Sequence, residues 1–103
     1  MWDLSAIRLQ VFLGTAGADV YNGTAGSDTL FGQAGADTIK GSTGDDLIDG
    51  GADNDSLLGE DGADTLLGGA GDDYIVGGEG SDRLSGGEDD DVLYGGAAGA
   101  EDI

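Results

Sequence analysis

The residues of this sequence that could do chemistry are carboxylates, and nine of them recur at a fixed interval of nine residues. Histidine and cysteine are absent, which removes the usual general base at neutral pH, the thiol nucleophile and zinc sites built from these residues. Oxygen ligands remain, and they suit hard divalent cations. The candidate metal-binding residues are Asp19, Asp28, Asp37, Asp46, Asp55, Asp64, Asp73, Asp82 and Asp91.

The overall charge is strongly acidic, because 22 aspartates and glutamates face three lysines and arginines, for a formal net charge of -19. A chain with this charge and 23 glycines in 103 residues has the composition of a disordered polypeptide unless a cation neutralises it. The charge disfavours nucleic acid and anionic membrane surfaces. The longest apolar run is Val11-Phe12-Leu13, too short to cross a bilayer. We therefore expect no nucleic-acid partner and no membrane insertion.

The elements that must position the carboxylates repeat with the same period. In rows of nine from Gly14, the first place is always glycine, the sixth aspartate and the eighth a large apolar or aromatic residue. This period fits no helix, and each row divides into a six-residue glycine-rich turn and three strand-like residues. The middle residue of each triplet should point inward, because side chains alternate across a strand. The predicted core stack is Tyr21, Leu30, Ile39, Ile48, Leu57, Leu66, Ile75, Leu84 and Leu93.

These rows resemble the haemolysin-type repeats of the repeats-in-toxin (RTX) family, written Gly-Gly-x-Gly-x-Asp-x-U-x with U large and apolar. The resemblance implies an all-β fold, a parallel β-roll or right-handed β-solenoid with two nonapeptides per coil. Aspartates 18 residues apart would then stack in two columns, and calcium would bridge them. One ion between each stacked pair gives about seven Ca2+ ions. The resemblance also implies a chain that folds on binding calcium, with magnesium a poor substitute.

Several rows depart from this pattern, and we expect these substitutions to strain individual turns. The second place departs at Thr15, Thr24, Gln33, Ser42 and Glu60, and the fourth place at Asp53 and Asp89. Acidic residues outside the sixth place are expected to be surface charge rather than ligands. These include Asp49, Glu60, Asp61, Glu79, Glu88 and Asp102.

The chain divides into three segments: residues 1–13 as an N-terminal lead-in coil and cap, 14–94 as nine repeats, and 95–103 as a decayed repeat and tail. An apolar cap is expected because a solenoid exposes a slice of its core at each end. Outward residues on alternate rows form an apolar strip: Leu58, Tyr74, Val76, Val92 and Tyr94. The strip is either a self-association surface or ordinary surface hydrophobicity, exposed or covered by a neighbouring part of a larger protein.

Two functions remain open. The first is a calcium-binding structural module without enzymatic activity; the resemblance implies a secreted, extracellular or cell-surface protein that leaves a bacterium by type I secretion. The second is a calcium-dependent filament, surface-layer or adhesin component that assembles through its ends or the apolar strip. A disordered acidic linker has no reason to keep three columns in phase. An ice-binding face would need a regular threonine ladder, which the second place lacks beyond Thr24.

Overall fold

Short strands separated by glycine-rich turns make up the protein, as described for residues 11–96 by a computed structural model. Each strand is the three-residue segment that follows a turn, and every strand has three residues. The strands are β1 (Val11–Leu13), β2 (Val20–Asn22), β3 (Thr29–Phe31), β4 (Thr38–Lys40), β5 (Leu47–Asp49), β6 (Ser56–Leu58), β7 (Thr65–Leu67), β8 (Tyr74–Val76), β9 (Arg83–Ser85) and β10 (Val92–Tyr94).

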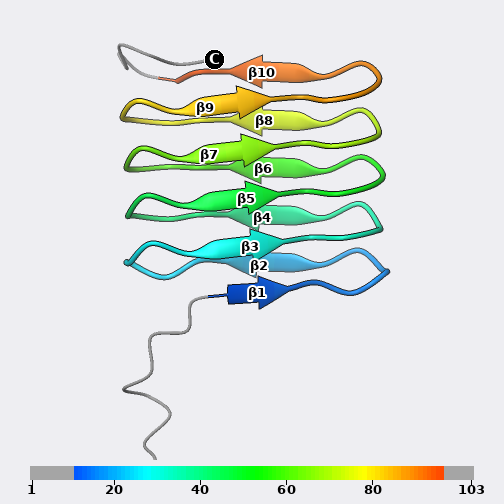
Figure 1. Ribbon diagram of the computed structural model, residues 1–103, viewed down its shortest axis with the longest axis horizontal. Coiled ribbons are helices and arrows are strands. Elements are labelled where there is room, and N and C mark those ends of the chain that lie inside the picture. Colours follow the sequence, from blue (N-terminus) through cyan, green and yellow to red (C-terminus); the bar gives the residue numbers. More distant parts are fainter. Residues whose placement is uncertain (1–10, 97–103) are drawn as a thin grey trace, which may run out of the picture.

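The strands form two parallel five-stranded sheets that face each other (Figure 1). The first sheet has the order β1-β3-β5-β7-β9, and the second has the order β2-β4-β6-β8-β10. Each strand pairs in parallel with the strand two places further along the chain; β4 pairs with β6, for example, with Ile39 opposite Leu57. One coil therefore consists of two nonapeptides, and the predicted parallel β-roll is confirmed.

The core between the sheets is the predicted single stack of large apolar side chains. Six of the middle-of-strand residues have no exposed surface, and Leu84 is 8% exposed. Burying one such side chain stabilises the fold by roughly 1.5–3 kcal/mol. The six are Leu30, Ile39, Ile48, Leu57, Leu66 and Ile75.

The ends of the core are partly covered. Phe12, Tyr21 and Leu93 are partly buried against the stack, and the rings of Phe12 and Tyr21 lie parallel with centroids 4.0 Å apart. Most of the predicted lead-in coil, residues 1–10, and most of the predicted tail, 97–103 with Asp102, lie outside the described residues. An aromatic pair thus closes the described N-terminal end of the core.

The predicted apolar strip lies on the outward face of the second sheet, on β6, β8 and β10. Tyr74, Val92 and Tyr94 are 45%, 47% and 55% exposed, whereas Leu58 and Val76 are half-buried. The rings of Tyr74 and Tyr94 meet edge to face at 5.8 Å. Within residues 11–96, no helix is long and apolar enough to cross a membrane.

Candidate metal centre

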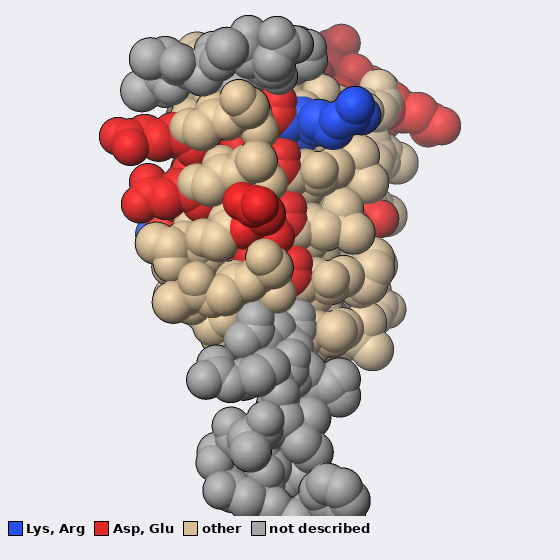
Figure 2. Space-filling model, turned by 60° about the vertical axis from the view of Figure 1, so that its left-hand side comes forward, with Lys and Arg blue, Asp and Glu red and all other residues tan. Residues whose placement is uncertain are grey.

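The sixth-place aspartates lie at the two edges of the roll, where each turn delivers the chain to the next strand (Figure 1). Figure 2 shows one of these edges, where acidic side chains follow the stacked turns and basic side chains are few. Seven of the nine aspartates are at most 3% exposed, and Asp19 and Asp91, at the ends, are half-buried. One column contains Asp19, Asp37, Asp55, Asp73 and Asp91, and the other contains Asp28, Asp46, Asp64 and Asp82.

Hydrogen bonds from backbone amides to aspartate carboxylates connect the stacked turns of each column. The amide of Asp37 donates to Oδ1 of Asp55 at 2.8 Å, and Oδ1 of Asp37 accepts from the amide of Asp19 at 2.7 Å. The carbonyl oxygen of Asp37 accepts from the amide of Ser56 at 2.8 Å. The amide-to-carboxylate bond recurs in seven pairs, each 18 residues apart: 19 to 37, 28 to 46, 37 to 55, 46 to 64, 55 to 73, 64 to 82 and 73 to 91. The register of the sheets therefore fixes the register of the carboxylates.

The second carboxylate oxygen of the central aspartates is buried without a hydrogen-bond partner. A Cβ added to Gly32 would stand 2.5 Å from Oδ2 of Asp37 and 2.7 Å from the carbonyl oxygen of Gly50. Only glycine fits there, and a side-chain oxygen and a backbone oxygen converge on it. A buried carboxylate oxygen without a partner is costly. The unpartnered atoms include Oδ2 of Asp37, Asp46, Asp55, Asp64 and Asp73.

The pKa values of four of these carboxyl groups are raised, first by burial and then by neighbouring carboxylates. Burial raises the pKa of Asp55 to about 7; the hydrogen bond from the Asp37 amide lowers it, and the charges of Asp73 and Asp37 raise it further. Burial likewise raises the pKa of Asp64 to about 7, and those of Asp46 and Asp73 to about 6. Burial is the main cause of these raised pKa values, and repulsion between stacked carboxylates adds to it.

The donor set fits calcium. Among the described residues, no three acidic side chains come close enough to hold a metal by themselves, so a cation would need backbone oxygens as well. Calcium accepts carboxylate and carbonyl oxygens together, in flexible geometry. The buried Oδ2 atoms and the first-place carbonyls, such as that of Gly50, supply such donors.

Acidic side chains outside the sixth place also connect stacked turns, a role that the sequence did not predict. Oδ2 of Asp53 accepts from the amide of Gly35 at 2.8 Å, and Oδ1 of Asp45 accepts from the amide of Ala63 at 2.9 Å. Both pairs are 18 residues apart, which is the only sequence signal that could have indicated them. Asp49, expected to be surface charge, is half-buried and accepts a hydrogen bond from the amide of Gly51 at 3.1 Å.

The expected strain is present at five of the seven substituted positions. Gln33, Ser42, Asp53, Glu60 and Asp89 adopt φ values between 70° and 76°, a left-handed conformation that costs a residue with a side chain about 1–2 kcal/mol. The expectation was wrong for Thr15 and Thr24, whose φ values are not positive. In their turns, the threonine instead donates hydrogen bonds to the sixth-place aspartate.

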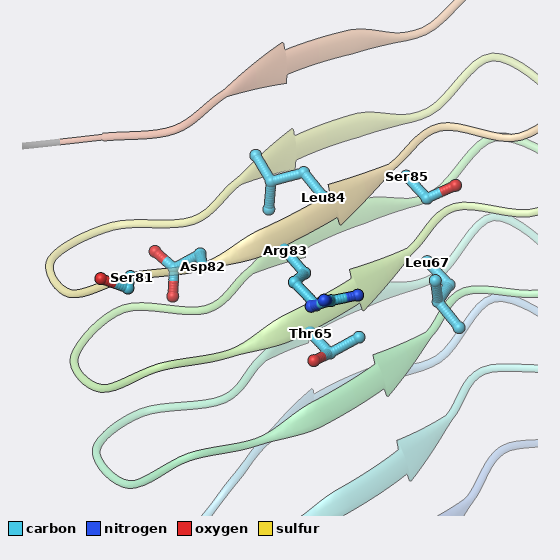
Figure 3. A pocket seen from close by; sticks show the side chains of 7 residues that line it. All are labelled: Thr65, Leu67, Ser81, Asp82, Arg83, Leu84 and Ser85. Carbon is cyan, nitrogen blue, oxygen red and sulfur yellow. The ribbon is translucent and has the colours of Figure 1, made fainter. Parts of the chain in front are cut away.

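An open hollow of about 660 Å³ lies beside β7, β9 and the turn before β9. Figure 3 shows Arg83 reaching across β7 toward Thr65, its partner in the sheet register. Ser81 and Ser85 line the hollow with Asp82, but the sequence contains no histidine to activate a serine. The hollow therefore carries no catalytic group of the serine–histidine type.

Comparison with known proteins agrees with this geometry. The family model of the RTX calcium-binding nonapeptide repeat matches the chain four times, at residues 13–48, 31–66, 40–75 and 67–98. The comparison with curated proteins gives no match. The family match covers most of the chain and coincides with the stacked turns and their aspartate columns. The chain therefore belongs to the family of RTX calcium-binding nonapeptide repeat proteins.

Proposed function

We propose that this chain is a calcium-binding structural module whose folding depends on the ion. The buried Oδ2 atoms without partners carry this proposal, because a folded chain that leaves them unneutralised is destabilised. Bound calcium supplies positive charge between stacked turns. The chain itself supplies the carboxylates of Asp19, Asp28, Asp37, Asp46, Asp55, Asp64, Asp73, Asp82 and Asp91 as candidate ligands.

The number of ions follows from the number of stacked turns. Seven pairs of aspartates are stacked, so one ion per pair sets an upper count of about seven ions. Fourteen positive charges would offset most of the net charge of -19. Without them, the stack contains too little apolar surface to outweigh the repulsion, and the free energy of metal binding becomes free energy of folding.

The setting that this behaviour suits is extracellular. Calcium-binding modules outside the cell have Kd values of roughly 10⁻⁴–10⁻³ M, so a module of this kind stays unfolded at low cytosolic calcium and folds after export. The family match supports placing the chain in a secreted or cell-surface protein that uses type I secretion. We propose no catalytic role, and the net charge of -19 disfavours nucleic acid and membranes as partners.

A calcium titration followed by far-UV circular dichroism and sedimentation velocity tests this function. A cooperative gain of β signal at constant monomer mass is the expected result, with no comparable gain in magnesium. An unchanged spectrum at millimolar calcium would refute the proposal.

A second candidate function is calcium-dependent assembly into a filament, a surface layer or an adhesin. It is favoured by the exposed strip on the second sheet, where Tyr74, Val92 and Tyr94 are each about half exposed and lie beside Leu58 and Val76. A contiguous apolar patch often marks an interface. Growth of the sedimenting mass with calcium, abolished by Tyr74→Ser with Tyr94→Ser, would establish this candidate instead.

A further inference from the structure

The first two turns hold their aspartates in a way that the later turns do not. In the first repeat, the amide of Thr15 donates to Oδ2 of Asp19 at 2.7 Å, and the Thr15 hydroxyl donates to Oδ1 at 2.9 Å. The second repeat is identical, with Thr24 donating to both oxygens of Asp28 at 2.7 Å and 2.9 Å. Both carboxylate oxygens of these aspartates therefore have donors from within their own turn.

The threonine hydroxyls are themselves held in place. Oγ1 of Thr15 accepts from the amide of Gly17 at 3.1 Å, and Oγ1 of Thr24 accepts from the amide of Gly26 at 3.2 Å. Each hydroxyl thus donates and accepts, which fixes its orientation toward the carboxylate. We call the turns at residues 14–19 and 23–28 the threonine turns.

The later turns have a different backbone. From the third repeat to the ninth, the second and fourth places both adopt positive φ, as at Ser42 with Gly44 and at Glu60 with Gly62. None of the four corresponding residues in the threonine turns does so. β-Branched threonine is poorly tolerated in the left-handed region. We call the turns from 32–37 to 86–91 the left-handed turns; in them Oδ2 of Asp37, Asp46, Asp55, Asp64 and Asp73 lacks a partner.

We infer that Thr15 and Thr24 replace calcium in the first two turns, so that Asp19 and Asp28 hold no ion and the calcium sites begin at the third repeat. This inference rests on the proposed function. Seven pairs of aspartates are stacked, and two of these pairs contain Asp19 or Asp28. At one ion per remaining pair, the chain binds five ions. The first coil, closed by the stacked rings of Phe12 and Tyr21, is then a metal-independent end against which the calcium-dependent coils form.

The experiment is the stoichiometry of tightly bound calcium in the whole chain, measured by native mass spectrometry and equilibrium dialysis. The wild type should bind five ions. Thr15→Gly with Thr24→Gly should bind seven, because the second-place glycine removes the hydroxyl donor and permits the left-handed turn. The matched control is Gln33→Gly with Ser42→Gly, which changes the same place in two left-handed turns and should leave the count at five.

Seven ions on the wild type would overturn the inference, as would an unchanged count of five in the double threonine variant. If that variant does not fold, the carboxylate ¹³C chemical shifts of the wild type test whether Asp19 and Asp28 bind an ion. In the folded, calcium-loaded wild type, exchange of calcium for cadmium should change the shifts of Asp55 and Asp64 and leave those of Asp19 and Asp28 in place; a change at Asp19 on this exchange refutes the inference. Failure of every variant to bind calcium would instead refute the proposed function.

Discussion

The threonine turns and the left-handed turns accommodate the carboxylate of the sixth-place aspartate in different ways. Each contains a carboxylate at the start of a strand. In the threonine turns, an amide and a hydroxyl from the same turn donate hydrogen bonds to both of its oxygens, as at Asp19. In the left-handed turns, Oδ2 of Asp55 or Asp64 is buried without a partner. Two turns that carry the same aspartate at the same place therefore differ in how many hydrogen-bond donors they supply to its carboxylate.

This difference comes from one side chain at the second place. Threonine supplies a hydroxyl but resists positive φ, whereas glycine, glutamine, serine and glutamate adopt it here, as Gln33 and Glu60 do. The turn conformation then decides whether the carboxylate has a donor. We infer that this local conformational preference decides which turns bind a cation.

The largest expected effect uses alanine at the fourth place in each kind of turn. Gly62 has φ of 106°, and its added Cβ would collide with the carbonyl oxygen of Gly44 in the turn below. Gly62→Ala should cost about 3 kcal/mol or more, from left-handed strain and overpacking together. Gly17 has only the Thr15 hydroxyl oxygen near that position, at 3.8 Å, so Gly17→Ala should change stability by about 0.5 kcal/mol or less.

Urea unfolding in saturating calcium measures both variants. Equal destabilisation by the two alanines would show that the turns do not differ in the way described.

Acid should partly replace calcium in the left-handed turns. Folding raises the pKa of Asp46 and Asp73 from 3.8 to about 6, and of Asp55 and Asp64 to about 7. Protonation therefore favours the folded state: this contribution is fully present below pH 3.8 and is lost as the pH rises through 6 to 7. The calcium-free chain should gain β signal in circular dichroism on acidification from about pH 8 to about pH 5.

The control for this prediction is Asp55→Asn with Asp64→Asn, which should show a smaller dependence on pH. A β signal that is lost on acidification would contradict the sign of these pKa shifts.

Removing a charge should have opposite signs in the two regions when calcium is absent. Asp64→Asn removes a buried charge, so it should stabilise the calcium-free fold, yet weaken the calcium-saturated fold by about 1–3 kcal/mol. Asp19→Asn disrupts the hydrogen bond from Thr15, so it should destabilise by about 1–2 kcal/mol both with and without calcium. Thermal unfolding in calcium, together with folding induced by a stabilising osmolyte in chelator, gives all four values. An effect of Asp19→Asn that depends on calcium would show that the two kinds of turn respond to the ion in the same way.

The smallest expected effect is that glycine at the second place changes stability in opposite directions in the two kinds of turn. Gln33→Gly relieves left-handed strain at φ of 70° and should stabilise the calcium-bound fold by about 0.5–1 kcal/mol after the entropy of glycine is counted. Thr24→Gly should destabilise the calcium-free fold instead, because it removes the hydroxyl bond to Asp28. Chemical denaturation in calcium measures Gln33→Gly, and folding induced by a stabilising osmolyte in chelator measures Thr24→Gly. Stabilisation by both glycines would contradict the role given to threonine.

Much of the architecture could be predicted from the sequence because its signals are periodic. The eighth-place residues became the buried stack, and the apolar strip of Tyr74 and Tyr94 lies on one sheet as expected. The two kinds of turn could not be predicted, since the family pattern treats Thr15 and Gln33 alike as substitutions for glycine. Their difference arises from side-chain hydrogen bonds inside the folded turn.

The bridging carboxylates were missed for a related reason. Asp53 and Asp45 reach amides 18 residues away in opposite directions along the chain, and no local pattern specifies which way a side chain extends. Metal ligation by the sixth-place aspartates stays a prediction, supported by their burial and by the Oδ2 atoms without partners.

The two-nonapeptide coil also determines how such a protein can change length in evolution. Deleting one nonapeptide would move every later strand to the opposite sheet, yet the core and the carboxylate columns would survive, since every repeat supplies the same residue to both. Only the outward faces would change sides, so that Tyr74 and Tyr94 on β8 and β10 would no longer share a sheet with Leu58 on β6 if the deletion fell between them. Gains and losses in pairs of repeats would leave that face continuous. Selection on the surface, rather than on stability, would then favour changes of repeat number by two.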